Sequence, residues 1–200
     1  GGVDVSGATL SLGNGNSSFA YSGGIAGTGG VTKLGAGVMT LAGVNTYAGP
    51  TNVARGTLRL GAAGALAYTN VTLGGGTDAA TLDLNGFNAT IASLLATGNN
   101  AVGNFVTNLS AGRTMAITGA SGGYALLVGG LNADNVVTKL TMTGGGALAV
   151  NSPSATLLVN NDANDAGSAH AATLDLSGLG SFTADVDALN VGDSPANNAR

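Results

Sequence analysis

The chain runs Gly29-Gly30-Val31-Thr32-Lys33-Leu34-Gly35-Ala36-Gly37-Val38-Met39-Thr40-Leu41-Ala42-Gly43, and it continues through Asn45-Thr46-Tyr47-Ala48-Gly49 into Gly56-Thr57-Leu58-Arg59-Leu60-Gly61. This stretch alternates apolar and polar residues over a few positions at a time, which is typical of short half-buried strands. Gly and Asn separate the alternations, and both tolerate the left-handed backbone of tight corners. The stretch therefore predicts a chain that makes a short strand, turns a corner and makes another.

The composition limits the fold to β structure. Gly accounts for 36 of the 200 residues, whereas Glu and Gln are absent and Lys occurs only at Lys33 and Lys139. The missing residues are the usual surface helix formers, so a helical protein is hard to build from this alphabet. Hydrophobic residues make up 44% of the chain, which argues against disorder. Gly has no period of three, which excludes collagen.

Charge and cysteine content exclude several classes of partner. The net charge is −4, and Arg55 and Arg59 are the nearest approach to a basic patch, so no nucleic-acid partner is expected. Cys is absent, which excludes disulfides and thiolate chemistry and is compatible with an exported protein. No apolar run has the length of a membrane span. Without a starting Met or an N-terminal signal, the chain is expected to be a mature product or a segment of something longer.

Short apolar–polar units recur along the chain without a strict period. Two larger echoes accompany them, since residues 31–34 return at 137–140 and residues 81–86 return at 173–178. Units this short cannot bury their apolar side alone, but stacked copies form one continuous core. The clearest copies are Thr9-Leu10-Ser11-Leu12, Thr57-Leu58-Arg59-Leu60, Thr81-Leu82-Asp83-Leu84 and Thr173-Leu174-Asp175-Leu176.

These units predict an all-β fold, a parallel β-solenoid. In each Thr-Leu-Asp-Leu unit the two Leu side chains face inward, and Thr and Asp face outward. With a coil of roughly twenty residues and about 4.8 Å between coils, the chain would form about ten coils over about 50 Å. No charged or Pro-rich linker interrupts the pattern. Residues 1–200 are therefore predicted to form a single solenoid domain or a segment of a longer one.

A specific family pattern is carried by Gly29, Gly30, Thr32, Lys33, Gly35, Gly37, Thr40, Leu41, Gly43, Asn45, Tyr47, Gly49, Thr51, Val53, Gly56, Thr57, Leu58, Leu60 and Gly61. On these residues, the segment 28–61 resembles the autotransporter-associated β-strand repeat. Its departures are mild, with Val31 and Met39 where Leu is common and Pro50 after the Gly. The resemblance implies a right-handed parallel β-helix in a large bacterial protein that is exported and displayed at the cell surface. It implies no common catalytic residues, so none is carried over.

The most polar segment, residues 160–170, is predicted to be a loop that protrudes from one coil. Asp162, Asn164 and Asp165 are candidate calcium ligands, because hard cations bind several oxygen atoms held on a tight turn. Ala166, however, stands where a third oxygen ligand belongs. We therefore favour an exposed polar turn, with no metal ion and no cofactor expected.

Candidate catalytic groups are sparse. Asp185 and Asp187 share one face of a predicted strand, and paired acids serve the polysaccharide lyases and hydrolases that use β-helical folds. A Ser-His-Asp arrangement would require His170, the only His, in the predicted loop. Scattered Asp residues also supply solubility to a surface with few charges, and Arg113 and Lys139 are expected to be solvated. We therefore expect no catalytic residues.

Three classes of function remain. The favoured one is structural, a rigid stalk or self-assembling fibre segment whose end coils stack on adjacent repeats or on another copy. The second is an adhesin that binds glycans or a host surface through a lateral face or the 160–170 loop. The third is a polysaccharide-degrading enzyme that depends on Asp185 and Asp187. The fold alone does not separate the first two.

Overall fold

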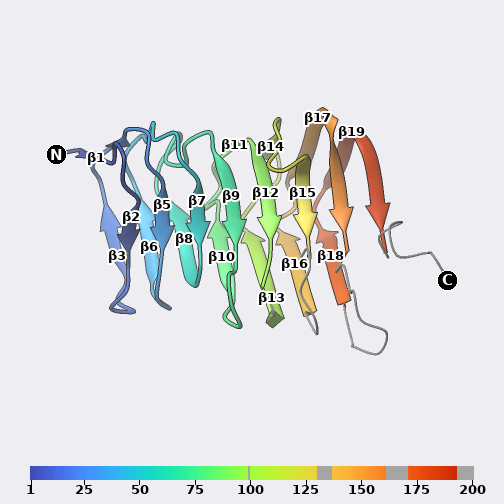
Figure 1. Cartoon of the computed structure of the whole chain (residues 1–200), viewed down its shortest axis with the longest axis horizontal. Coiled ribbons are helices and arrows are strands. Elements are labelled where there is room, and N and C mark those ends of the chain that lie inside the picture. Colours follow the sequence, from blue (N-terminus) through green and yellow to red (C-terminus); the bar gives the residue numbers. More distant parts are fainter. Residues whose placement is uncertain (99, 130–136, 161–170, 193–200) are drawn as a thin grey trace.

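The computed structural model describes residues 1–98, 100–129, 137–160 and 171–192. Within these ranges every regular element is a β-strand, and the ladders between strands are parallel. The strands stack one after another along the long axis of the molecule (Figure 1). This confirms the predicted all-β parallel solenoid. The same ranges hold no helix with the length and hydropathy needed to cross a membrane.

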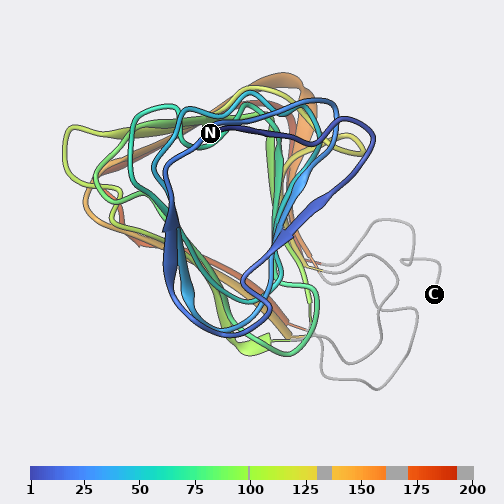
Figure 2. The same ribbon diagram turned by 90° about the vertical axis from the view of Figure 1, so that its left-hand side faces the viewer.

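The chain winds around a roughly triangular cross-section (Figure 2). The first of its three faces is a seven-stranded sheet in the order β18-β16-β13-β10-β8-β6-β3. Its register places like positions above one another, since Met39 pairs with Leu58, and Leu58 with Leu82. The strands are β3 (Phe19–Tyr21), β6 (Val38–Leu41), β8 (Gly56–Leu60), β10 (Ala80–Asp83), β13 (Asn100–Thr107), β16 (Val137–Thr143) and β18 (Ala171–Gly178).

The second face continues the same winding with its own parallel ladder. Its first six strands pair in chain order, and the C-terminal parts of two longer strands extend the ladder. The six strands are β2 (Leu10–Leu12), β5 (Val31–Lys33), β7 (Thr51–Val53), β9 (Asn70–Leu73), β12 (Ser93–Ala96) and β15 (Tyr124–Val128), and the longer ones are β17 (Ala147–Val159) and β19 (Ser181–Val191).

The third face is regular only in parts. The two-stranded sheet of β1 (Val3–Asp4) and β4 (Ile25–Ala26) begins it. Further on, β11 (Ala89–Ile91) and β14 (Thr114–Ile117) lead into the N-terminal parts of β17 and β19. Because β17 pairs with β14 at one end and with β15 at the other, it carries the chain round the corner onto the second face.

The coils grow longer along the chain. On the second face Val31 pairs with Thr51, and Thr51 with Val71, so two successive coils there have the same length. Further on, Leu94 pairs with Leu126, which is a distinctly longer turn of the chain. The expected count of about ten coils assumed a constant length, so it is not confirmed. The right-handed sense of the winding stays a prediction.

Inward-facing apolar side chains of successive coils form one continuous core. In the unit that begins at Thr81, the side chains of Leu82 and Leu84 are fully buried, whereas Thr81 is only half-buried, as the alternation predicts. Full burial of a Leu or Val side chain contributes about 1.5–3 kcal/mol relative to an exposed position. Each coil adds several such side chains, so neighbouring coils stabilise one another.

Candidate functional site in the repeat segment

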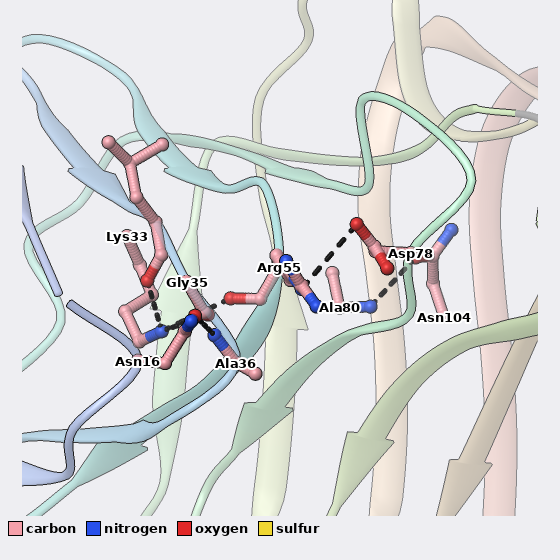
Figure 3. Close-up of polar contacts among 9 residues, drawn as sticks. Asn16, Lys33, Gly35, Ala36, Arg55, Asp78, Ala80 and Asn104 are labelled. Carbon is pink, nitrogen blue, oxygen red and sulfur yellow. Dashed lines mark hydrogen bonds and ion pairs between the residues drawn. The ribbon is translucent and has the colours of Figure 1, made fainter. Parts of the chain in front are cut away.

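Lys33 is buried although it carries a charge. It lies two positions after Val31 on β5, so both side chains face the core. Its ammonium donates hydrogen bonds to the carbonyl oxygens of Leu34 at 2.6 Å, Gly35 at 2.8 Å and Arg55 at 3.2 Å (Figure 3). Three donors thus meet three acceptors. Because Arg55 belongs to the next coil, this side chain ties two coils together at their corner.

The electrostatics of Lys33 follow from this surrounding. Burial of the ammonium lowers the pKa of Lys33 below its ordinary value, and the positive charge of Arg55 lowers it further. The three carbonyl dipoles offset part of the lost hydration. An ammonium with all its donors engaged in one corner has no position left for a ligand, so the arrangement is structural.

Asn45 joins three successive coils through its side chain. Its Oδ1 accepts a hydrogen bond from the backbone N–H of Ile25 at 2.7 Å, and its Nδ2 donates to the carbonyl oxygen of Ala65. Its backbone N–H donates to the carbonyl oxygen of Gly64 at 3.0 Å. The residue is buried, and the third face has no regular strand at this place. The hydrogen bonds of Asn45 therefore connect the coils here in place of those between paired strands.

Tyr47 begins a chain of hydroxyl groups inside the repeat. Its hydroxyl lies 2.7 Å from Thr51 Oγ1, which lies 3.0 Å from Thr69 Oγ1 in the next coil. All three residues are buried. Burial raises the pKa of the Tyr47 hydroxyl, and its hydrogen bond to Thr51 opposes this shift. Like Lys33 and Asn45, Tyr47 therefore holds neighbouring coils together.

Polar side chains also follow the corner between the second and the first face. Asn16 Oδ1 accepts a hydrogen bond from the backbone N–H of Ala36, one coil further on, at 2.8 Å. Arg55 Nε lies 3.4 Å from a carboxylate oxygen of Asp78 in a half-exposed ion pair (Figure 3). Exposed ion pairs of this kind contribute about 0–1 kcal/mol. The corner is thus held by backbone-directed hydrogen bonds more than by charge.

Asp83 faces outward but is buried by its partners. Its Oδ2 accepts a hydrogen bond from Arg59 Nε at 2.6 Å. Its Oδ1 accepts from the backbone N–H of Asn85 at 2.9 Å and from Asn108 Nδ2 at 2.8 Å. Arg59, Asp83 and Asn108 belong to three successive coils of the first face. A carboxylate with both oxygens engaged in this way is a tie between coils rather than a free acid.

The echo of this unit at residues 173–178 repeats its turn. Asp175 Oδ1 accepts hydrogen bonds from the backbone N–H of Ser177 at 3.1 Å and from its hydroxyl at 2.6 Å. These hydrogen bonds lower the pKa of Asp175, and the charge of Lys139 adds a smaller effect in the same direction. In both copies the Asp carboxylate thus accepts a hydrogen bond from the backbone N–H two positions on. Asp83 is the last residue of β10, whereas Asp175 lies within β18.

The residues considered as catalytic candidates lie apart from the buried polar side chains of the repeat, Lys33, Asn45 and Tyr47. Asp185 and Asp187 are both exposed on β19, where Asp185 pairs in register with Asn151. Arg113 is exposed and Lys139 is half-buried. In the described ranges, no three His, Cys, Asp or Glu side chains lie close enough to hold a metal ion. The calcium candidates Asp162, Asn164 and Asp165, together with His170, lie outside the described residues.

Sequence reasoning assigned no role to Lys33, Asn45 and Tyr47 beyond their place in the family pattern. For Lys33 a signal existed, because the period of two places it on the same strand face as Val31. A buried Lys at that position implies carbonyl partners. For Asn45 no comparable signal existed, since the residue lies in an irregular segment.

The fold and the ties between its coils define the class of protein, a parallel β-solenoid with polar side chains buried in its repeat. Residues 31–60 match the family model of the passenger-associated-transport repeat. This match confirms the resemblance inferred from the sequence, and the chain carries a copy of this repeat. No curated protein and no solved structure matches the chain. The repeat implies an autotransporter passenger segment, and hence a bacterial protein that is secreted or displayed at the surface.

Proposed function

We propose that this chain is a non-enzymatic structural segment of the passenger, a rigid stalk stacked end to end on adjacent coils. The observation that carries the proposal is that the buried polar side chains of the matched repeat form hydrogen bonds between coils. Lys33, Asn45 and Tyr47 direct their hydrogen bonds to neighbouring coils, either directly or through Thr51. Ties repeated along the axis resist sliding and bending of one coil against the next.

The ends of the described solenoid support stacking on further β structure. β1, β2 and β3 are the outermost strands at one end, and β18 and β19 are the outermost described strands at the other. Outermost strands pair readily with other strands. At the C-terminal end an open hollow of about 340 Å³ is lined by side chains that include Leu174, Phe182 and Leu189. Leu189 is 59% exposed there, and a further coil would bury it.

Coil length favours an adjacent repeat over a second copy as the partner at this end. In the last described coil Leu157 pairs with Leu189, whereas in the first coil Leu10 pairs with Val31. The chain between the paired residues is thus clearly longer in the last coil than in the first. Coils of unequal length match poorly at their corners. Head-to-tail assembly of identical copies is therefore the second choice within the structural proposal.

Electron microscopy of the purified chain over a range of concentrations tests the structural proposal. Isolated short rods at every concentration support a stalk segment. Fibres with a repeat of one chain length support self-assembly through the end coils. Compact or irregular particles under native conditions would contradict both.

The non-enzymatic part of the proposal has a test of its own. Asp185 and Asp187 are exposed on a strand, and the buried Asp83 is paired with Arg59. Incubation with acidic and neutral polysaccharides should therefore release no oligosaccharides. Release that is lost in both Asp185→Ala and Asp187→Ala would instead identify a polysaccharide-degrading enzyme.

A further inference from the structure

Two asparagines of the chain are followed directly by glycine, Asn14 and Asn85. Both are exposed, and both lie in turns between strands. In an Asn-Gly pair the glycine nitrogen can attack the side-chain amide of the asparagine, because glycine has no Cβ atom to shield that nitrogen. The reaction needs a nitrogen and an amide that are free to approach each other. The two pairs can therefore be compared by the hydrogen bonds that hold them.

Asn14 and Gly15 are the central residues of a β-turn between β2 and β3. The N–H of Asn16 closes the turn by donating to the carbonyl oxygen of Gly13 at 3.3 Å. Among the residues that the structure describes, none forms a hydrogen bond with the Asn14 side-chain amide or with the N–H of Gly15. A Cβ atom on Gly15 would meet nothing within 4 Å, so the space around this residue is open. Both reacting groups of this pair are thus free.

The second pair is held in place by hydrogen bonds on both of its residues. Asn85 Nδ2 donates to the carbonyl oxygen of Leu60 at 3.0 Å in the preceding coil, and the Asn85 N–H donates to Asp83 Oδ1 at 2.9 Å. The N–H of Gly86 donates to the carbonyl oxygen of Asn108 at 2.9 Å, one coil further on. The attacking nitrogen and the leaving amide of this pair are therefore both engaged, although Asn85 itself is exposed.

We propose that Asn14 is a site of spontaneous deamidation and that the fold protects Asn85 from the same reaction. The Gly15 nitrogen forms a bond to Asn14 Cγ, and the bond between Cγ and Nδ2 breaks. The proton of the Gly15 nitrogen leaves with Nδ2 as ammonia, and a succinimide ring remains. Water then opens the ring at either carbonyl carbon, which leaves aspartate or isoaspartate at position 14. Water is the only co-reactant.

The product changes this turn in two ways. The amide becomes a carboxylate, which adds one negative charge to the formal net charge of −4. Isoaspartate also carries the main chain through Cγ, which inserts one more carbon atom into the turn. In the same turn, Asn16 Oδ1 accepts a hydrogen bond from the Ala36 N–H at 2.8 Å, one coil further on (Figure 3). Isoaspartate at position 14 therefore lengthens the chain beside a hydrogen bond between coils.

The proposed modification goes beyond the structural proposal and does not depend on it. It is a property of one turn outside the matched repeat, whereas the structural proposal rests on buried side chains within residues 31–60. Conversion is measured from peptide masses, and the stalk is tested by particle shape in the electron microscope. Either proposal can therefore fail while the other stands.

Incubation of the whole purified chain at mildly alkaline pH, followed by peptide mapping with mass spectrometry, tests the site. Cleavage after Lys and Arg places Asn14 in residues 1–33 and Asn85 in residues 60–113, and fragmentation locates the converted residue. We expect conversion at Asn14 to be at least about tenfold faster than at Asn85, because the hydrogen bonds of the second pair must break before it reacts. In urea that unfolds the chain, the two sites should convert at similar rates, since both are Asn-Gly pairs.

Gly15→Ala is the matched variant for this reaction. Its Cβ meets nothing within 4 Å in the folded chain, so the fold should be kept, yet it shields the attacking nitrogen. Conversion at Asn14 should therefore slow severalfold, with an unchanged circular dichroism spectrum. The proposal is overturned if Asn14 in the folded chain converts no faster than Asn85, or if Gly15→Ala converts as fast as the unaltered chain.

Discussion

The ammonium of Lys33 lies 3.2 Å from the carbonyl oxygen of Arg55, which belongs to the next coil of the solenoid. A charged side chain is thus used as a hydrogen-bond bridge between coils. Its stem packs in the core, and Gly13 of the preceding coil lies close beside it. This one side chain therefore contacts three coils, and its removal should destabilise the packing of all three.

Lys33→Met tests this bridge with a side chain of similar length. Two effects compete, because the variant removes a buried charge but leaves three carbonyl oxygens without their donor. Each unsatisfied buried group costs about 1–3 kcal/mol, so the loss should win by about 2–4 kcal/mol in free energy of unfolding. Urea titration followed by circular dichroism measures the change.

The control for Lys33→Met is Lys139→Met, the only other lysine, which is half-buried on β16. It should change the free energy of unfolding by less than about 0.5 kcal/mol, as surface substitutions usually do. Equal effects of the two substitutions would show that the carbonyl bridge contributes little.

Asn45→Ala is predicted to be the most damaging change to an amide in the repeat. It leaves the N–H of Ile25 and the carbonyl of Ala65 without their partner, in a buried place. The expected loss is about 2–4 kcal/mol in free energy of unfolding. Asn52→Ala, on the half-buried outer side of β7, is the matched control and should have little effect. Similar midpoints for both variants would contradict the assigned role of Asn45.

The sequence predicted the core of this fold better than its polar ties. The alternation around Leu82 and Leu84 predicts a strand, the side of it that faces the core, and its stacking on similar strands. These features can be read from the sequence because a period of two involves only neighbouring residues. Asp83 was correctly predicted to face outward. Its burial was not predictable, because it depends on Arg59 and Asn108, which reach it from the coils before and after.

Coil length also escaped prediction. The estimate of the coil count assumed a coil of roughly twenty residues, and the register from Val31 to Thr51 agrees with this length. Later coils hold more residues, in part because their strands are longer, as β17 and β19 are in comparison with β5 and β7. The alternation within one strand does not give the length of the whole coil. The hydrogen bond from Thr118 Oγ1 to the Tyr68 hydroxyl was not predicted either, since the two residues are far apart along the chain.

Gly37→Ala tests how closely the coils approach one another. A Cβ at this position would lie 2.5 Å from the carbonyl oxygens of Asn16 and Ser17 in the preceding coil. Backbone atoms cannot yield as side chains do, so we expect a loss of about 1–3 kcal/mol. At Gly15 a Cβ would meet nothing within 4 Å. Gly15→Ala should therefore be close to neutral, and a comparable loss there would point to glycine flexibility instead of coil contact.

Ionisation of the Tyr47 hydroxyl makes the stability of the solenoid depend on pH in the alkaline range. Burial raises the pKa of its hydroxyl in the folded chain above the ordinary value of 10.0. Above that pH the unfolded chain loses a proton that the folded chain keeps, so the folded chain binds more protons and its stability falls as pH rises. The contribution of Tyr47 is fully present below pH 10.0 and is lost as the pH rises through the raised folded pKa.

Tyr47→Phe isolates this effect. The variant should be less stable by about 1 kcal/mol at neutral pH, because the hydrogen bond to Thr51 is lost. All other titrating groups are common to both chains, so the difference between their unfolding free energies reports on Tyr47 alone. That difference should shrink when the pH is raised above 10.0, because only the unaltered chain loses the contribution of the hydroxyl. Urea titrations at a series of pH values measure it, and a difference that stays constant would show that the hydroxyl ionises alike in the folded and unfolded chains.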